Sequence, residues 1–555
     1  MKLPLAAATL LLCVVPKLTT ATPATHNTYA TTLPDGTPSG EIEKLIGTPG
    51  YHFTLAEEAG NGWYPTVLRD DGTPVYALVD PETGAYVPSD VVLGSTTPPP
   101  AESFEKYETE AARAAKCAAN AYCAWKSAQA TPRVTSLRLS GEVRNLVIPI
   151  QFSNHGDRTL VPVETIADDL FNDGEMSVED YFTKQSHGKL QLVSDVKAWV
   201  QIPKTEAECA GSDGSSGTSL AIMECLQMAL TEAMTRDNID METYDQDGDG
   251  KFDSLTFVHS GYGAEYGDQD DLMAHFKDRI WSHSWELTGD TFDTALQGQP
   301  YAIMSSMHGV ANGHVARLGI AVHEIAQMLG APTTYGEFPG YGLGYWDIMS
   351  NPFGFGGTEY NCGNMAAPSK LEMGWATSEE ILESAEYSLE HSGISGVVHQ
   401  ISKGFPSGEY LLIENRQPHG YDADVPQGGL AIYHVDTNVG QVKGGHPQQD
   451  DFPTNHYRIS LVQADGQYEL EQHIDMGDSS DLFHGNNVKG MSPEGAIIHE
   501  IEGEENPHVE GHPNTKSYSG GTFKNTGITI TDISEASIDT PMTFKVEFGE
   551  SEAST

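Results

Sequence analysis

The stretch 318-LGIAVHEIAQMLGAPTTYG-336 decides what the centre of this chain of 555 residues can be. In a helix, residues four apart lie on one face. The pattern H-E-x-x-H uses that spacing to bring two histidines to one zinc ion, while the glutamate between them polarises a metal-bound water. Here His323 and Glu324 open the pattern, but its fifth position holds Gln327. The stretch therefore predicts a zinc-site helix that lacks one of its two histidine ligands.

The third ligand of such a site follows after the helix turns away at a glycine. Gly330 stands at that turn, and Thr333 then holds the third-ligand position. Zinc binds an imidazole nitrogen strongly, whereas a glutamine amide and a threonine hydroxyl are weak donors. Structural zinc sites draw on roughly 10–16 kcal/mol of binding free energy, and a single good ligand should leave little of it. We expect Glu324 to have no activated water to act through.

The same residues also allow three alternatives. The His-Glu dipeptide could be an ordinary pair on a helix. The segment could bind a different metal or a small ligand. A shifted ligand could also complete the zinc site, and the candidates in the sequence are His308, His314, Glu337 and Asp347. Of these, Asp347 is expected to have a structural role.

Several further segments stand in a fixed order around this helix. The segment 341-YGLGYWDIMSNPFGFGG-357 follows it directly and is similar to the W-D-[IL]-M-S stretch under the metal in a group of secreted zinc peptidases. The remaining segments are 146–154, 177–192, 245–267, 280–287, 409–436, 463–470, 478–485 and 517–535. Together they resemble the immune inhibitor A family of secreted zinc metallopeptidases over about residues 140 to 548, and residues 72–94 are more loosely similar to the leader of that family.

The resemblance implies a multidomain α/β (α+β) fold, with a zincin-like metallopeptidase core followed by a C-terminal β-sandwich. The expected parts are a signal peptide at 1–21, an N-terminal leader or propeptide-like region with a helix at 22–135, a metallopeptidase-like domain at 140–385 and a β-sandwich domain at 386–550. Against the family pattern H-E-x-x-H-x-x-G-x-x-D, His323 matches the first zinc ligand and Glu324 the general base.

Gln327 and Thr333 depart from the second and third ligands of that pattern. The implied activity is peptide-bond hydrolysis, which these two changes should weaken or abolish. The alternative is a non-catalytic, calcium-stabilised secreted protein that uses a peptidase fold to bind peptides, glycans or a partner.

Local sequence patterns indicate the same division of the chain. A buried strand at 143–152, an amphipathic helix at 219–234 and a strand at 255–261 predict an α/β or α+β domain. Ser177 and Asp180 have the spacing of a helix N-cap and its third residue. From about residue 384, short alternating stretches typical of a β-sandwich recur at 410–416, 429–436, 457–465, 527–534 and 542–548. Before residue 135, the sequence predicts short strands such as 74–79, a linker at 95–104 and a helix at 105–130.

The first 21 residues predict export from the cell. Lys2 precedes an apolar run from Leu5 to Val15, which has signal-peptide length and is too short to span a bilayer. The chain has 30 Lys and Arg against 79 Asp and Glu, a formal net charge of −49. Such a surface repels nucleic acid and anionic membranes. We expect a secreted protein without a membrane span, whose substrate or ligand is a protein or peptide.

A second constellation, 245-DQDGDGKFD-253, predicts a calcium loop. Its positions 1, 3, 5, 7 and 9 are held by Asp245, Asp247, Asp249, the backbone carbonyl of Lys251, and Asp253. Gly250 at position 6 permits the sharp turn. Position 12 is Thr256 instead of a bidentate glutamate, and a strand follows, so the loop is not an EF-hand. A solvated acidic turn is the alternative, and the family resemblance also points to calcium.

The remaining cysteines and histidines give weaker signals. Cys13 belongs to the expected signal peptide, and local spacing favours the pairs Cys117–Cys123 and Cys209–Cys225, with Cys362 left over; spacing alone does not fix this connectivity. We expect a packed or hydrogen-bonded role for each of three histidines, His259, His275 and His283. The acidic pair in 478-DSSD-481 predicts a polar loop, with a second calcium site as the alternative.

Overall fold

The computed structural model describes the strands between residues 27 and 92 and most of the chain from residue 139 onward. The described ranges are 139–172, 174–211, 220–266, 278–287, 296–308, 315–335, 341–357, 359, 361–440, 456–472, 474–486, 488–498, 511–518 and 521–552. The expected signal peptide, the helix at 105–130, Cys117 and Cys123 lie outside the described residues.

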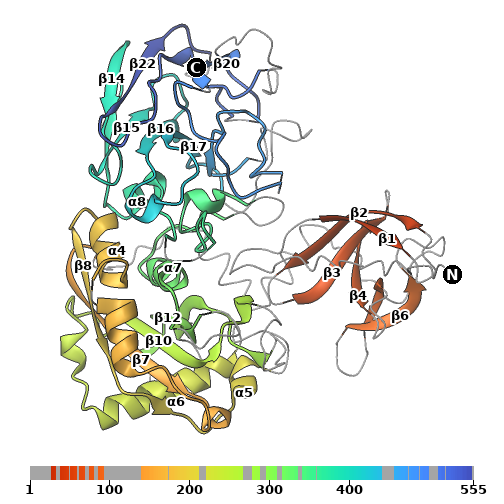
Figure 1. The fold of residues 1–555 in the computed structure, drawn as a ribbon, viewed down its shortest axis with the longest axis vertical. Coiled ribbons are helices and arrows are strands. Elements are labelled where there is room, and N and C mark those ends of the chain that lie inside the picture. Colours follow the sequence, from red (N-terminus) through yellow and green to blue (C-terminus); the bar gives the residue numbers. More distant parts are fainter. Residues whose placement is uncertain are drawn as a thin grey trace, which may run out of the picture.

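The N-terminal region forms a six-stranded antiparallel sheet in which each strand pairs with the next (Figure 1). The strands are β1 (Asn27–Thr32), β2 (Pro38–Thr48), β3 (Tyr51–Glu58), β4 (Gly62–Leu68), β5 (Pro74–Val79) and β6 (Tyr86–Val92). The strand expected at residues 74–79 is β5.

The central domain is built on a mixed sheet in the order β11-β12-β10-β7-β8. These strands are β7 (Gly141–Gln151), β8 (Leu190–Val196), β10 (Ser254–Tyr262), β11 (His283–Leu287) and β12 (Gln299–Met307); the short β9 (Val200–Gln201) also pairs with β7. Neighbours are parallel except β11 and β12, which are antiparallel. Parallel strands read as near-continuous apolar runs when helices cover both faces, and nearly all of β10 and β12 is buried.

Helices cover both faces of this sheet. Alternate residues of β7 point to opposite sides, so Val143 and Val147 join one core while Leu146 and Ile148 join the other. The first core contains residues of α4 (Val178–Gln185) and α7 (Leu318–Met328), and the second contains residues of α5 (Glu206–Ala210) and α6 (Leu220–Arg236). A disulfide between Cys209 and Cys225 joins α5 to α6, and Cys362 is a free, buried thiol.

The helix expected after Ser177 begins there. The Ser177 hydroxyl accepts a hydrogen bond from the Asp180 backbone N–H at 3.1 Å, and an Asp180 carboxylate oxygen accepts one from the Met176 N–H at 3.2 Å. This reciprocal bonding satisfies two N–H groups at the helix start, much as a glutamate does in a capping box. The aspartate at this position is therefore no obstacle to capping.

Residues from Thr377 to Phe548 form two five-stranded sheets, called here the C-terminal sheets. One has the order β13-β15-β16-β17-β18 and the other β14-β22-β21-β19-β20. The strands are β13 (Thr377–Glu380), β14 (Ala385–Leu389), β15 (Val397–Ile401), β16 (Glu409–Arg416), β17 (Gly429–Asp436), β18 (Ile459–Leu461), β19 (Val488–Ser492), β20 (Gly495–Ile498), β21 (Ile528–Thr531) and β22 (Met542–Phe548). Apolar residues of both sheets, such as Ile413 and Phe544, share one core.

The chain thus has a mixed α/β core and a β-rich C-terminal region, the coarse architecture that the sequence predicts. Two strands are shorter than expected. Beyond Leu461, the Ala464 N–H bonds to the Asp481 carbonyl instead of continuing β18, and β21 ends at Thr531, just before Asp532 with a φ of +52°. No helix within the described residues is long and apolar enough to cross a membrane.

Candidate active site

The helix α7 carries the predicted site and lies between the mixed sheet and the C-terminal sheets (Figure 1). All its residues except Gln327 are buried. Gly319 permits its close approach to the next segment, because a Cβ there would lie 1.9 Å from the Pro352 carbonyl oxygen. The helix ends at Met328, and Gly330 follows with a φ of +93°, which suits glycine. The turn expected at Gly330 is therefore present.

His323 is a buried, neutral imidazole whose tautomer is set by the backbone. Its Nδ1 lies 2.7 Å from the carbonyl oxygen of Ile348 and must donate to it. Burial lowers the pKa of His323 to about 4, against the opposing effect of that hydrogen bond. A neutral ring that carries its proton on Nδ1 has a lone pair on Nε2. This is the arrangement that a metal-binding histidine needs.

Gln327 donates a hydrogen bond to that lone pair. Its side-chain Nε2 lies 2.8 Å from Nε2 of His323, so the amide donates a hydrogen bond to the ring. The same amide lies 3.5 Å from the Tyr335 hydroxyl, and the rings of Tyr335 and His323 stack with centroids 6.2 Å apart. Tyr335 is not among the predicted site residues, because the ligand pattern assigns no role to its position. The glutamine thus occupies the ring edge at which a metal would bind, and the tyrosine lies over a face of the same ring.

Glu324 lies in the interior with one carboxyl oxygen unsatisfied. The residue is 1% exposed, and its Oε2 has no hydrogen-bond partner among the described residues. Burial raises the pKa of Glu324 well above its usual value, and the neighbouring Glu265 adds to the effect. Glu265 is itself buried, and its carboxyl group accepts hydrogen bonds from the hydroxyl and the backbone N–H of Ser282. Both effects favour the neutral acid over the carboxylate at Glu324.

Thr333 shows no contact that would make it a ligand. It is half-buried, and its hydroxyl makes no hydrogen bond to another described residue. The next residue, Thr334, donates to Asp347 at 2.7 Å. Asp347 also accepts hydrogen bonds from Ser369 Oγ at 2.9 Å and from the N–H groups of Met349 and Ala366. Asp347 thus has the bonding of a structural hub.

Of the three remaining candidates for a shifted ligand, His308 lies among the described residues. His308 Nε2 lies 3.1 Å from a carboxyl oxygen of Glu359, which occupies that ring nitrogen. His314 and Glu337 lie outside the described residues. A zinc site needs three protein ligands of imidazole, thiolate or carboxylate type. At the three pattern positions the chain supplies one imidazole, one neutral amide and one hydroxyl, a donor set that does not fit a zinc ion.

The acidic loop, unlike this helix, brings several possible metal ligands close together. Carboxyl oxygens of Asp245, Asp247 and Asp253 all lie within 4.8 Å of one another. The turn is made by Gly248 and Gly250, whose φ values are +75° and +86°. Burial raises the pKa of Asp253, and the neighbouring loop carboxylates add to the rise. A divalent cation that prefers oxygen ligands would relieve this repulsion.

The two remaining residues of the expected ligand set have different contacts in this loop. Asp249 Oδ1 accepts from the Lys251 N–H at 2.9 Å, and the Lys251 ammonium group donates to the Gly298 carbonyl at 2.9 Å. The Asp249 N–H lies 3.0 Å from Asp245 and 3.1 Å from Asp247. Thr256 lies in β10, so a strand follows the loop, as expected.

Two of the three histidines predicted to be packed are described, and both are buried with hydrogen bonds. His283 contacts the Trp281 carbonyl at 2.7 Å and the Tyr301 hydroxyl at 2.9 Å, and His259 Nδ1 accepts from the Gly261 N–H at 3.2 Å. His275 lies outside the described residues. Asp478 joins Glu469 and Asp475 in a second acidic group, whereas Asp481 accepts a hydrogen bond from the indole of Trp346.

The comparisons with known proteins address the segment that contains α7. Residues 165–371 match the family model described as immune inhibitor A peptidase M6, catalytic domain. A search of the curated proteins found no match. The matched segment runs from the end of α3 (Val163–Thr165) into α8 (Ala367–Glu372) and contains both the acidic loop and α7. Residues 165–371 are therefore similar to the catalytic domain of the immune inhibitor A peptidases, and the resemblance seen in the sequence is confirmed for this part of the chain.

Proposed function

We propose that this protein is a secreted homologue of the immune inhibitor A metallopeptidases in which zinc-dependent peptide hydrolysis is weak or lost. The family domain supports a metallopeptidase-type function acting on proteins or peptides. One observation carries the proposed loss: the Gln327 amide donates a hydrogen bond to Nε2 of His323, the atom that would bind zinc. An amide that donates to this lone pair cannot at the same time present its oxygen to a metal on the ring.

The state of Glu324 supports the same proposal. A general base must be ionised to take a proton from water. Burial and the proximity of Glu265 favour the neutral acid instead. A bound metal would stabilise the carboxylate through its charge and through the water between them. Without a metal, Glu324 has neither the charge nor the water that hydrolysis needs.

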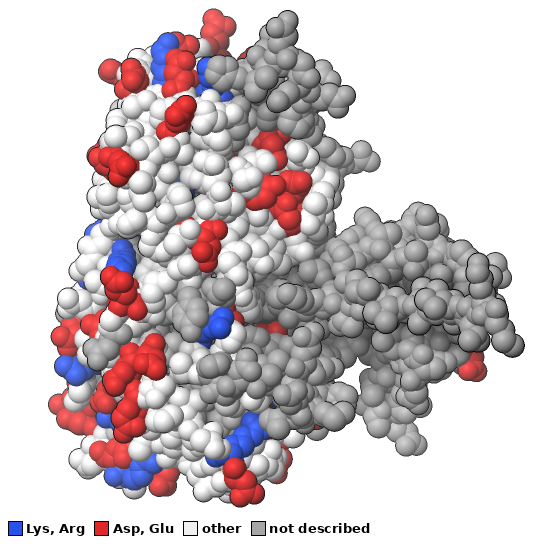
Figure 2. Space-filling view, viewed as in Figure 1, with Lys and Arg blue, Asp and Glu red and all other residues white. Residues whose placement is uncertain are grey.

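A second candidate function rests on the acidic loop. We propose that calcium binds Asp245, Asp247 and Asp253, with Asp249 and the Lys251 carbonyl nearby, and braces the loop before β10. A calcium-stabilised protein of this fold could bind a peptide or protein partner without cutting it. Acidic side chains are spread over the described face of the molecule (Figure 2), which disfavours nucleic acid as that partner.

The finer divisions of the chain belong to the same proposal. They are a signal peptide at 1–21, a leader at 22–135, a zincin-like domain at 140–385 and a β-sandwich at 386–550. The pairing of β13 (Thr377–Glu380) with β15 favours a start of the β-sandwich near residue 377 instead of 386. The shared core of the two C-terminal sheets supports a sandwich.

The proposal is tested by the zinc and calcium content of the secreted, dialysed protein, measured by elemental mass spectrometry. We expect about one calcium and no zinc for each chain. Near one zinc for each chain would overturn the proposed loss of the zinc site. In that case, proteolysis of a casein substrate by the wild type and its disappearance in Glu324→Gln would establish an active peptidase.

A further inference from the structure

The C-terminal sheets present one buried ion pair to the domain that carries α7. Arg416, the last residue of β16, donates from Nε and Nη2 to the two carboxyl oxygens of Asp422 at 2.9 and 2.6 Å. The two residues are 0% and 1% exposed. Such a forked pair fixes the orientation of both groups. Arg416 Nη1 and Asp422 Oδ1 each make a further hydrogen bond, and both of these bonds go to the domain that carries α7.

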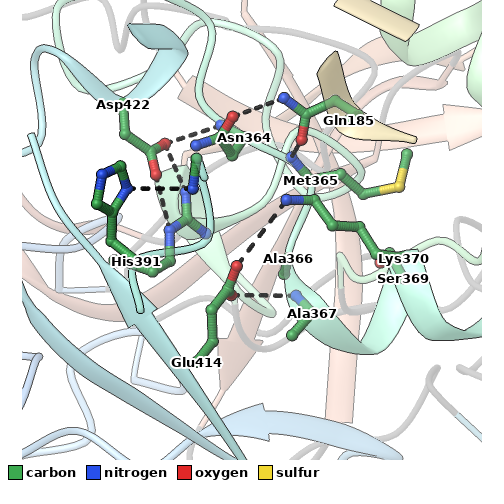
Figure 3. Close-up of polar contacts among 12 residues, drawn as sticks. Gln185, Asn364, Met365, Ala366, Ala367, Ser369, Lys370, His391, Glu414 and Asp422 are labelled. Atoms are coloured by element: carbon green, nitrogen blue, oxygen red, sulfur yellow. Dashed lines mark hydrogen bonds and ion pairs between the residues drawn. The ribbon is translucent and has the colours of Figure 1, made fainter. Parts of the chain in front are cut away.

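Both members of the pair hold the chain just before the Ile348 carbonyl, Arg416 through Trp346 and Asp422 through Asn364. Asp422 Oδ1 accepts from the Asn364 N–H at 2.8 Å, and the Asn364 carbonyl accepts from the Ile348 N–H at 3.4 Å. Figure 3 shows Asp422 facing Asn364 across this contact. On the opposite side, Arg416 Nη1 donates to the carbonyl of Trp346, two residues before Ile348. The pair therefore holds the chain at two points, the Trp346 carbonyl and the Ile348 N–H, that come directly before the Ile348 carbonyl.

Further contacts from the C-terminal sheets hold the same segment. The Trp346 indole N–H donates to Asp481 at 2.7 Å, and the Tyr345 N–H donates to the Met476 carbonyl at 2.8 Å. The approach is close enough that a Cβ on Gly477 would lie 2.6 Å from the indole nitrogen. The C-terminal sheets thus hold the segment from Tyr345 to Ile348 in addition to the hydrogen bonds that Asp347 makes within its own domain.

The carbonyl of Ile348 is the acceptor that decides the tautomer of His323. We propose that Arg416 and Asp422 are positioning residues for His323: they hold the chain just before the Ile348 carbonyl, so that this carbonyl accepts a hydrogen bond from Nδ1–H and the lone pair stays on Nε2. The inference rests on the proposed function in taking His323 as the centre of the site. It assigns the C-terminal sheets a part in that site, in addition to any separate binding role.

A purely stabilising role accounts for the pair less well. Replacing a buried ion pair by apolar residues of similar volume is often neutral or stabilising, so burial of the pair is weak evidence that the fold needs it. If the pair instead positions the Ile348 carbonyl, its removal should change which ring nitrogen of His323 holds the proton while the protein stays folded. This difference can be measured.

The experiment uses full-length protein labelled with ¹⁵N-histidine, with His323 assigned by the signal that disappears in His323→Asn. Long-range ¹H–¹⁵N spectra report which ring nitrogen holds the proton. The test variants are the conservative Arg416→Lys, which keeps the charge beside Asp422 and loses the fork, and the apolar double change Arg416→Met with Asp422→Leu. The matched control is Asp436→Asn, which alters a buried carboxylate of the same sheets that pairs with His456 at 3.1 Å.

In the wild type and in the control we expect the proton on Nδ1 of His323. In both test variants we expect the ratio of the Nε2–H to the Nδ1–H form to rise about fivefold, which is the effect of weakening one hydrogen bond. A folded Arg416→Lys variant with unchanged His323 signals would overturn the inference. A wild-type protein with the proton already on Nε2 would also overturn it.

Elemental analysis of the same samples separates this inference from the proposed function. Zinc in the wild type, together with a tautomer that depends on Arg416, would overturn the proposed loss of the metal and leave the positioning role standing. A wild type without zinc, whose His323 signals do not respond to Arg416→Lys, would overturn the positioning role and leave the proposed loss of the metal standing.

Discussion

The helix α7 and the acidic loop both have the spacing of a metal site, and they differ in what their donors bond to. At α7, the one good donor, His323 Nε2, accepts a hydrogen bond from Gln327 inside the protein. In the loop, Asp245 and Asp247 accept backbone N–H groups, which leave their negative charge uncompensated. A hydrogen bond from an amide satisfies a neutral ring nitrogen, whereas three clustered carboxylates still offer oxygen ligands to a cation. In the proposed function, a side chain therefore takes the place of the metal at the helix, whereas the loop keeps its carboxylates available for a cation.

Restoring the donors of the helix should have the largest effect on this comparison. Gln327→His together with Thr333→Asp returns an imidazole and a carboxylate to the second and third ligand positions. With three ligands in place, we expect zinc affinity to rise about a thousandfold, roughly 4 kcal/mol, which is well under the full free energy of a zinc site. Isothermal titration with zinc measures this change directly.

The matched control for that experiment is Gln327→Ala with Thr333→Ala, which opens the same space and adds no donor. If zinc affinity rises equally in the control, removal of the Gln327 amide is enough and the site draws on another ligand. If zinc affinity rises in neither variant, these two positions are not ligand positions.

Removal of calcium is expected to have the next largest effect, and it should act on the loop alone. A ligand present at a hundred times its dissociation constant stabilises the folded state by about 2.7 kcal/mol. Chelation with EGTA should therefore lower the melting temperature of the wild type, whereas Asp245→Asn with Asp253→Asn should show no response to EGTA. The exposed Asp168→Asn serves as a control that keeps the full response. A wild type that is insensitive to EGTA would identify the loop as a solvated acidic turn.

Local sequence patterns were sufficient to predict the features of α7 and of the loop that depend on residues close together in the chain. The glycine at position 330, the Ser177 cap and the strand after the loop follow from φ preferences, capping and apolar runs, which a short window contains. The family match over residues 165–371 agrees with the order of segments along the chain. The chemistry of the ligand positions could likewise be judged from residue types alone.

The parts that the sequence did not predict depend on residues far apart in the chain. Ile348, whose carbonyl sets the His323 tautomer, lies 25 residues after it, and Arg416 lies 70 residues after its Trp346 acceptor. Tyr335 approaches His323 only because the turn at Gly330 brings the chain back. Glu324 faces Glu265 across two separate elements. Such contacts become visible only when the packing of the elements is known.

The pH dependence of the free energy of unfolding should distinguish α7 from the acidic loop, because Glu324 lies on α7. Its pKa is raised in the folded protein, so its contribution to stability is fully present below the pKa of the unfolded chain and is lost as pH rises toward the folded value. Glu324→Gln keeps the size of the side chain and cannot ionise. At pH 8 the unfolded chain ionises at this position while burial opposes ionisation in the fold, so we expect the change to raise the free energy of unfolding by about 1.4 kcal/mol or more, the free energy of one pKa unit. At pH 4 we expect little change.

Urea unfolding at the two pH values measures this difference. The control is Glu164→Gln, an exposed acid at the start of α3. An equal effect of Glu324→Gln at pH 4 and pH 8 would mean that Glu324 is ionised in the folded protein, as it would be beside a bound cation.

The smallest effect is expected from Tyr335→Phe. Its size shows whether the tyrosine helps to hold the Gln327 amide on His323. The Tyr335 hydroxyl lies 3.5 Å from the Gln327 amide, at the outer limit of a hydrogen bond, whereas that amide lies 2.8 Å from His323. If the short bond to the ring holds the amide, loss of the hydroxyl should change the free energy of unfolding by less than about 0.5 kcal/mol and leave zinc affinity as it was. The stacked ring remains in the variant, so packing is preserved. A clear gain in zinc affinity would instead mean that the tyrosine orients the amide, and the closure of the site would then depend on three residues and not on two.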